Sequence, residues 1–242
     1  MSRGLRAAVV AVGDELLLGD IVNGNAAWLG AELAAVGAPV VHSSMVGDTV
    51  ERIVPAVRRA LEDADVVVLT GGLGPTSDDL TREAVAAVAG APLVRQPALE
   101  AELRAKFAAY GVDMPDAVLK QADVPEGAVV LDNPVGTAPG LVVPPPTGTA
   151  PTIVVLPGPP RELQPMWATA ARTEAFRAAT SGAVEYRQTM LRLFGLPESE
   201  IAETLRLADG DGCPILYQDD RARGALLMER LGPSMFALST PY

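Results

Sequence analysis

Two adjacent aspartates, Asp78 and Asp79, end a glycine- and proline-rich stretch that reads VVVLTGGLGPTSDD over residues 66–79. Its three glycines carry no side chains, so backbone amides can approach a ligand closely. The amides at the start of a following helix favour an anion. Two carboxylates would repel a bare phosphate, but Mg²⁺ is commonly held by one or two carboxylates together with substrate phosphates. The stretch therefore predicts a metal–phosphate site, or else acids that only stabilise a helix N-terminus.

The same loop is distinct from two common nucleotide-binding motifs. It lacks the Lys-Ser/Thr pair of a Walker A loop and the G-x-G-x-x-G of a dinucleotide fold. Thr76 or Ser77 could cap the following helix, with Asp79 three residues after Thr76 as in a capping box. The loop is therefore expected to hold an anion or a polar ring edge through its backbone.

Four further polar or glycine-rich turns follow predicted strands, at 13–25, 46–49, 133–140 and 156–163. Each could be a simple turn, but ligands of open α/β sheets bind beyond the carboxyl ends of the strands. Together the five turns predict one shared site. Its candidate ligand-binding residues are Gly13, Asp14, Asn23, Asn25, Thr70, Gly71, Gly72, Leu73, Gly74, Thr76, Ser77, Asn133, Gly136, Thr137, Gly158 and Pro159.

The candidate catalytic residues are Asp78, Asp79, Glu15 and Asp48, and the first two are the candidate metal ligands. A divalent cation held there, with or without Asp14, Glu15 or Asp48, would bridge a diphosphate and activate water. Glycine-loop amides would stabilise charge on the attacked phosphate. Glu15 or Asp48 could act as the base if burial or a like-charged neighbour raises its pKa.

The elements that must position these residues alternate between strand and helix. Apolar periodicity predicts strands at 5–13, 39–47, 65–70, 140–143 and 152–156, a hairpin tip at 146–151, and helices at 25–37, 50–64, 79–90, 98–111 and 161–180. Such alternation indicates an α/β fold with a mostly parallel sheet between helical layers. We expect this domain to span residues 1–180.

A second, smaller α/β domain is predicted over residues 186–242, after a linker at 180–186. It is expected to contain a strand at 186–195, a helix at 197–208 and a strand at 213–218.

Composition excludes several classes of protein. The net charge of −11 argues against a general nucleic-acid binder, and no apolar run reaches the roughly 20 residues of a membrane span. The short apolar run near the N-terminus is interrupted at residues 13–15, unlike a signal peptide. Cys213 is the only cysteine, so no intramolecular disulfide can form. We expect a soluble, cytoplasmic protein.

Five motifs together resemble the CinA (competence/damage-inducible) family over about residues 5–165. They are GDELLLGDIVNGN, VGDTVERI, TGGLGPTSDDLTREA, NPVGTAPG and LPGPPRE. The first domain also resembles the molybdopterin-binding fold of the MoaB and MogA type. RLFGLPESEIAETL, residues 192–205, resembles the small KH-like domain that follows in CinA proteins.

The resemblance implies two different activities. Molybdenum-cofactor proteins bind or adenylylate a pterin, and their two aspartates align with Asp48 and Asp79. CinA-type domains are associated with metal-dependent hydrolysis of ADP-ribose to AMP and ribose 5-phosphate. The Asp78–Asp79 pair and the GDELL start favour the CinA branch, so we expect such a pyrophosphatase with Mg²⁺, Mn²⁺ or Co²⁺, with or without a monovalent cation. The alternatives are a pterin- or nucleotide-binding module without hydrolysis and a non-catalytic regulatory protein.

Two further expectations follow from the resemblance. Longer CinA proteins carry a C-terminal domain that deamidates nicotinamide mononucleotide, whereas this sequence stops at Tyr242 after a segment that resembles the family poorly. We therefore expect no amidohydrolase activity here. Related folds form dimers or trimers, so a homo-oligomer is expected.

Overall fold

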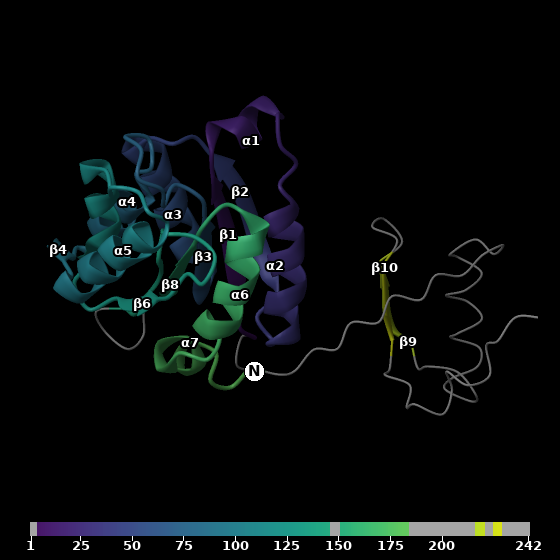
Figure 1. Ribbon diagram of the computed structural model, residues 1–242. Coiled ribbons are helices and arrows are strands. Elements are labelled where there is room, and N and C mark those ends of the chain that lie inside the picture. The colour runs from purple at the N-terminus through teal and green to yellow at the C-terminus, as the bar shows by residue number, and fades with distance from the viewer. Residues whose placement is uncertain (1–3, 146–150, 184–215, 221–224, 229–242) are drawn as a thin grey trace, which may run out of the picture. The chain divides into compact units, whose positions relative to one another are not determined.

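The computed structural model describes residues 4–145, 151–183, 216–220 and 225–228, and the chain forms two compact units, Met1–Tyr186 and Arg187–Tyr242 (Figure 1). In the second unit, β9 (Leu216–Asp220) pairs antiparallel with β10 (Ala225–Met228). The elements predicted at 186–195 and 197–208 lie outside the described residues, as does most of the hairpin tip. The KH-like domain and its boundary therefore stay predictions.

The first unit is built on a six-stranded sheet. Its order is β2 (Val40–Val46), β1 (Ala7–Val12), β3 (Val66–Thr70), β8 (Thr152–Leu156), β7 (Gly140–Val143) and β6 (Val129–Leu131). The first four strands run parallel, whereas β7 and β6 are antiparallel to their neighbours. The expected mostly parallel sheet is confirmed.

Helices cover both faces of this sheet (Figure 1). Apolar side chains of α3 (Val50–Asp63), α4 (Thr81–Ala89) and α5 (Pro97–Ala109) form one buried cluster with alternate residues of the strands. A second cluster lies on the other face, beneath α2 (Gly24–Ala35), α6 (Pro160–Ala170) and α7 (Glu174–Ala179). Because Val9 and Val10 point to opposite clusters, the central strands are apolar throughout. The three-layer αβα architecture is therefore confirmed.

The predicted helix at 161–180 is wrong in one respect, because it consists of two helices. The Thr173 side chain accepts a hydrogen bond from the Phe176 amide at 3.3 Å and caps the second helix, α7. The chain thereby turns between α6 and α7, and the rings of Trp167 and Phe176 meet edge to face at 5.4 Å.

Several short elements escaped prediction. They are the edge strand β6, α1 (Asp14–Leu18), β4 (Leu93–Arg95), the 3₁₀ helix η1 (Asp116–Ala122) and β5 (Asp123–Pro125). Strand β4 pairs antiparallel with β5, and η1 packs against α5, so the chain from β4 to β5 forms a small subassembly beside the main sheet. None of the helices in the described part of the chain is long and apolar enough to cross a membrane.

Gly71 lies where β3 leaves the sheet between β1 and β8. Its amide donates to the Leu156 carbonyl at 3.0 Å, and its φ of 94° falls in the left-handed region. A Cβ atom at this position would lie 2.2 Å from the backbone oxygen of Val12. Only glycine lets the glycine loop, residues 71–74, begin this close to β1.

We predict that Gly71→Ala lowers the free energy of unfolding by about 3 kcal/mol or more, since backbone strain and a backbone clash combine. Gly90→Ala is the matched control, because Gly90 has a φ of 64° but no atom within 4 Å of an added Cβ. It should cost only about 1 kcal/mol. Urea unfolding measures both variants, and equal losses would contradict the role of the close approach.

Candidate functional site

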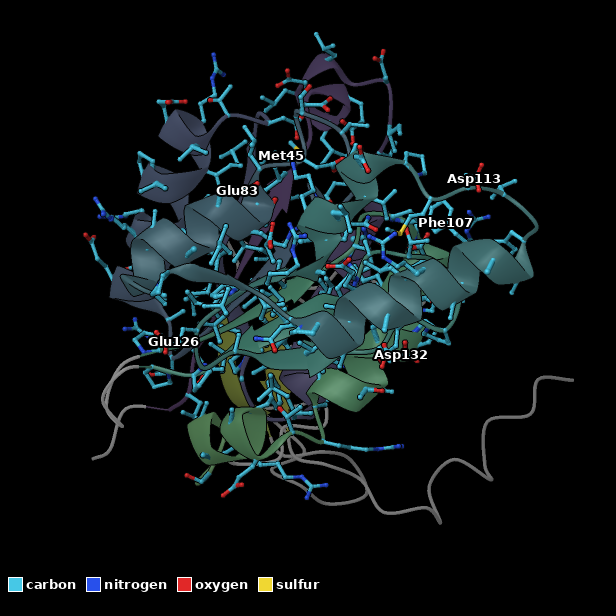
Figure 2. All side chains as sticks on the ribbon, turned by 60° about the vertical axis from the view of Figure 1, so that its left-hand side comes forward. Met45, Glu83, Phe107, Asp113, Glu126 and Asp132 are labelled. Atoms are coloured by element: carbon cyan, nitrogen blue, oxygen red, sulfur yellow. The ribbon has the colours of Figure 1, made fainter. Side chains whose placement is uncertain are left out.

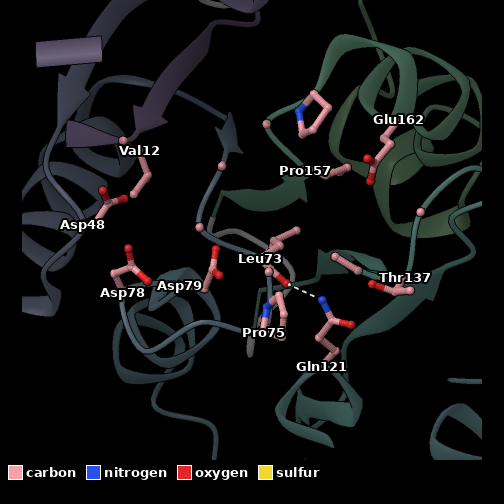
Figure 3. A pocket seen from close by; sticks show the side chains of 18 of the residues that line it. Val12, Asp48, Leu73, Pro75, Asp78, Asp79, Gln121, Thr137, Pro157 and Glu162 are labelled. Carbon is pink, nitrogen blue, oxygen red and sulfur yellow. Dashed lines mark hydrogen bonds between the residues drawn. The ribbon is translucent and has the colours of Figure 1, made fainter. Parts of the chain in front are cut away.

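A pocket of about 530 Å³ opens at the carboxyl ends of β1, β3 and β8 (Figure 3). Its volume lies within the range common for small-molecule sites. Most of the predicted site residues line it, namely Gly13, Glu15, Asp48, Gly71, Gly72, Leu73, Gly74, Asp78, Asp79, Gly136, Thr137, Gly158 and Pro159. All five turns singled out in the sequence thus contribute to one cavity.

The other predicted residues are not part of this lining: Asp14, Asn23, Asn25, Thr70, Thr76, Ser77 and Asn133. The Asn25 amide donates to the Gly158 carbonyl at 2.7 Å and so holds a pocket loop. Asn23 caps α2 by accepting from the Ala26 amide at 3.1 Å. Of these residues, Asn25 thus positions the wall of the pocket.

Three carboxylates gather on one side of the pocket. Figure 3 shows Asp48, Asp78 and Asp79 side by side there. Asp48 accepts from the Asp14 amide at 2.9 Å, while Asp79 accepts from the amide and the hydroxyl of Thr76 at 2.9 and 2.5 Å. We call Asp48, Asp78 and Asp79 the acidic side.

The acidic side is not a helix cap. The helix predicted from residue 79 begins at Thr81, and its N-cap residue Leu80 makes no side-chain capping bond. The Thr81 hydroxyl donates to the Gly71 carbonyl at 2.8 Å, and its amide to the Gly72 carbonyl at 3.1 Å. These two bonds start the helix later than the capping pattern predicts. Asp79 therefore closes a turn within the loop, which removes helix capping as a sufficient reason for the two acids.

The environments of Asp48 and Asp78 move their pKa values in opposite directions. Burial is the main cause that raises the pKa of the Asp48 carboxyl, and the charges of Glu15, Asp14 and Asp78 add to it. Hydrogen bonding in the turn of residues 76–79 is the main cause that lowers the pKa of Asp78. Neighbouring acids with divergent pKa values are typical of sites where one carboxylate moves a proton and another stays charged.

Two cations that the sequence analysis missed hold the loop from behind. Arg82 is only 1% exposed, and its guanidinium donates to the carbonyls of Leu73 and Gly74 at 2.7 and 3.0 Å. Lys120 donates to the carbonyls of Thr76 and Asp79 at 2.9 and 2.7 Å. An arginine on the inward face of an otherwise apolar helix was the signal that could have revealed the first of them.

The amides of the loop are left available. Among the hydrogen bonds of the described residues, none uses the backbone N–H of Gly72, Leu73 or Gly74. Successive unpaired backbone amides can bind an anion.

The opposite wall is organised by Asn133, which is 1% exposed. Its side-chain oxygen accepts from the amides of Val135 and Gly136 at 3.0 and 2.7 Å, and its NH₂ group donates to the Ala138 carbonyl at 2.9 Å and to the Glu162 carboxylate at 2.8 Å. Glu162, which reaches the pocket from α6, was not among the predicted site residues.

The remaining lining comes from residues absent from the prediction, chiefly Gln121, Tyr110, Pro75 and Val135. Gln121 is fully buried, and its side-chain NH₂ group donates to the Leu73 carbonyl at 3.3 Å. Within the described residues, no group of three or more His, Cys, Asp or Glu side chains is arranged to hold a metal ion by itself.

Comparison with known sequences gives consistent matches. The family model described as probable molybdopterin binding domain matches residues 8–176. A CinA-like protein of Frankia casuarinae is 48% identical over 206 residues, which cover 83% of this chain and 47% of the relative. A putative competence-damage inducible protein of Desulforudis audaxviator is 42% identical over 202 residues, 84% of this chain and 48% of the relative. The chain thus spans about half the length of these curated relatives.

Among solved structures, the CinA protein of Thermoplasma acidophilum, itself of unknown function, is similar over its whole length. It is 36% identical, with a TM-score of 0.63, and the match covers 69% of this chain and 97% of that one. The protein therefore belongs to the CinA family, and residues 8–176 form its probable molybdopterin binding domain.

Proposed function

We propose that the pocket binds a phosphorylated pterin or nucleotide. The observation that carries this proposal is the glycine loop, whose carbonyls are held by Arg82 while three successive amides remain without partners among the described residues. Such amides suit phosphate oxygens. The family's domain description points to the same class of ligand.

A binding experiment tests this proposal directly. We expect ADP-ribose or AMP, added with Mg²⁺, to raise the unfolding temperature, because a ligand at a hundred times its Kd stabilises the folded state by about 2.7 kcal/mol. Removal of the metal with EDTA should weaken nucleotide binding, whereas binding of a pterin through ring contacts should persist. No stabilisation by either class of ligand would contradict the proposal.

A second candidate is metal-dependent hydrolysis of a nucleotide-sugar diphosphate, with ADP-ribose as the expected substrate. The acidic side favours it, because its divergent pKa values fit acid–base chemistry. Asp78 and Asp79 fit the protein's share of a magnesium site completed by substrate phosphates. A divalent cation bound there would supply electrophilic stabilisation of the diphosphate oxygens.

The chain's own residues have separate parts in this proposed reaction. Asp48, with its raised pKa, takes the proton of the attacking water. As the new P–O bond forms, the bond to the bridging oxygen breaks and gives AMP and ribose 5-phosphate. The amides of the glycine loop stabilise the charge that develops on the phosphoryl oxygens.

Hydrolysis is tested by following AMP release from ADP-ribose with Mg²⁺, Mn²⁺ or Co²⁺. We expect Asp79→Asn to lower kcat by about a hundredfold or more, as when a group that stabilises transition-state charge is removed. Asp113→Asn is the matched control and should leave the rate unchanged, because Asp113 is exposed in the loop after α5 and does not line the pocket (Figure 2). No AMP with any metal would contradict hydrolysis and leave the binding proposal standing.

The raised pKa of Asp48 also has a consequence that needs no substrate. Above the ordinary pKa of an aspartate the folded state binds more protons than the unfolded state, so the free energy of unfolding falls as pH rises through the raised pKa. Asp48→Asn abolishes this fall and keeps an acceptor for the Asp14 amide. The difference in unfolding temperature, variant minus wild type, should therefore increase as the pH rises from about pH 4 to about pH 7. A constant difference would contradict the raised pKa.

Self-association and a cytoplasmic location stay predictions of the sequence. A regulatory role without chemistry remains the alternative if neither ligand binding nor hydrolysis is observed.

A further inference from the structure

Gln121 carries an unused hydrogen-bond acceptor in the wall of the pocket. The residue is 0% exposed, yet it is part of the pocket lining. Its Oε1 atom is buried and has no hydrogen-bond partner among the described residues. Buried side-chain oxygens are nearly always paired, so an unpaired one beside a cavity points to a partner supplied by the ligand.

The orientation of the Gln121 amide is determined by its neighbours. Its other end meets the Leu73 carbonyl at 3.3 Å, and a carbonyl oxygen can only accept. That end must therefore be the NH₂ group. The same carbonyl also accepts from Arg82 at 2.7 Å, so both donors fix its position. The acceptor end is consequently directed away from Leu73, and Figure 3 shows it on the side of Thr137.

This part of the pocket differs in chemistry from the acidic side. Figure 3 shows Gln121 and Thr137 across the cavity from Asp48 and Asp78. Tyr110, 66% exposed, and Val135, 45% exposed, line the pocket as well and offer apolar surface to a planar ring. Aromatic side chains stack on heterocycles, and a buried acceptor in the same pocket can bind a ring N–H or amino group. The phosphate end of a ligand, with its cation, thus belongs on the acidic side of the pocket, and its ring end across the cavity on the side of Gln121.

We propose that Gln121 determines specificity by accepting a hydrogen bond from the amino group of an adenine-type ring. This inference rests on the proposed binding of a nucleotide and does not depend on hydrolysis. A ring without that amino group leaves Oε1 buried and unpaired, and sites built around a polar group reject analogues that lack it.

The test compares AMP with purine riboside 5′-monophosphate, which has hydrogen in place of the amino group. Titration calorimetry with Mg²⁺ present should show AMP binding at least about tenfold more tightly to the wild type. Gln121→Met keeps the length of the side chain and removes both hydrogen bonds, and it should bind the two nucleotides equally. Gln164→Met is the matched control, because Gln164 is exposed on α6 outside the pocket, and it should retain the wild-type preference. A thermal melt of each variant verifies that it is folded.

The outcomes separate this inference from the proposed function. Binding of both nucleotides to the wild type with equal affinity would overturn the role of Gln121 alone and would indicate that only water pairs with Oε1. Retention of the preference in Gln121→Met would also overturn it, since the discrimination would then arise elsewhere. Failure of both nucleotides to bind the wild type would overturn this inference together with nucleotide binding by the pocket.

Discussion

The buried guanidinium of Arg82 is the contact on which the site depends. It is held inside the domain on α4, and it donates to two consecutive carbonyls of the glycine loop. An arginine is buried only at a considerable free-energy cost, which these charge-assisted bonds offset. Because the carbonyls turn inward to meet it, the loop keeps one conformation, and the three amides that lack partners among the described residues remain available to a ligand.

The pocket joins two parts of the chain with different chemistry. The acidic side follows the strands β2 and β3, and its carboxylates are held by loop contacts such as those of Asp48 with the Asp14 amide and of Asp79 with Thr76. Two other lining residues, Tyr110 and Gln121, come from the subassembly between β4 and β5. Lys120, next to Gln121, bonds the loop carbonyls of Thr76 and Asp79 and so links the two parts. A change in the subassembly would therefore reach both ends of a bound ligand.

Charge explains why binding and hydrolysis are both chemically reasonable in one cavity. Backbone amides can hold phosphate whether or not a metal is present, whereas carboxylates beside a phosphate require a cation to offset their repulsion. The acidic side thus distinguishes a site that only binds from one that also activates water. The raised pKa of Asp48 favours the second possibility, since it makes this carboxylate a better proton acceptor.

The sequence by itself determined the αβα architecture, because strands and helices form according to apolar runs and helical periodicity within each segment. It also indicated the five turns of the pocket, since glycine, proline and carboxylates cluster after the strands. It did not reveal where α4 begins, because Thr81 is bonded to Gly71 and Gly72, residues outside any capping pattern. Nor did it reveal Gln121 as part of the site, because its contact with Leu73 joins residues 48 positions apart. Only the tertiary structure decided these features, since they rest on contacts between segments whose proximity no local pattern encodes.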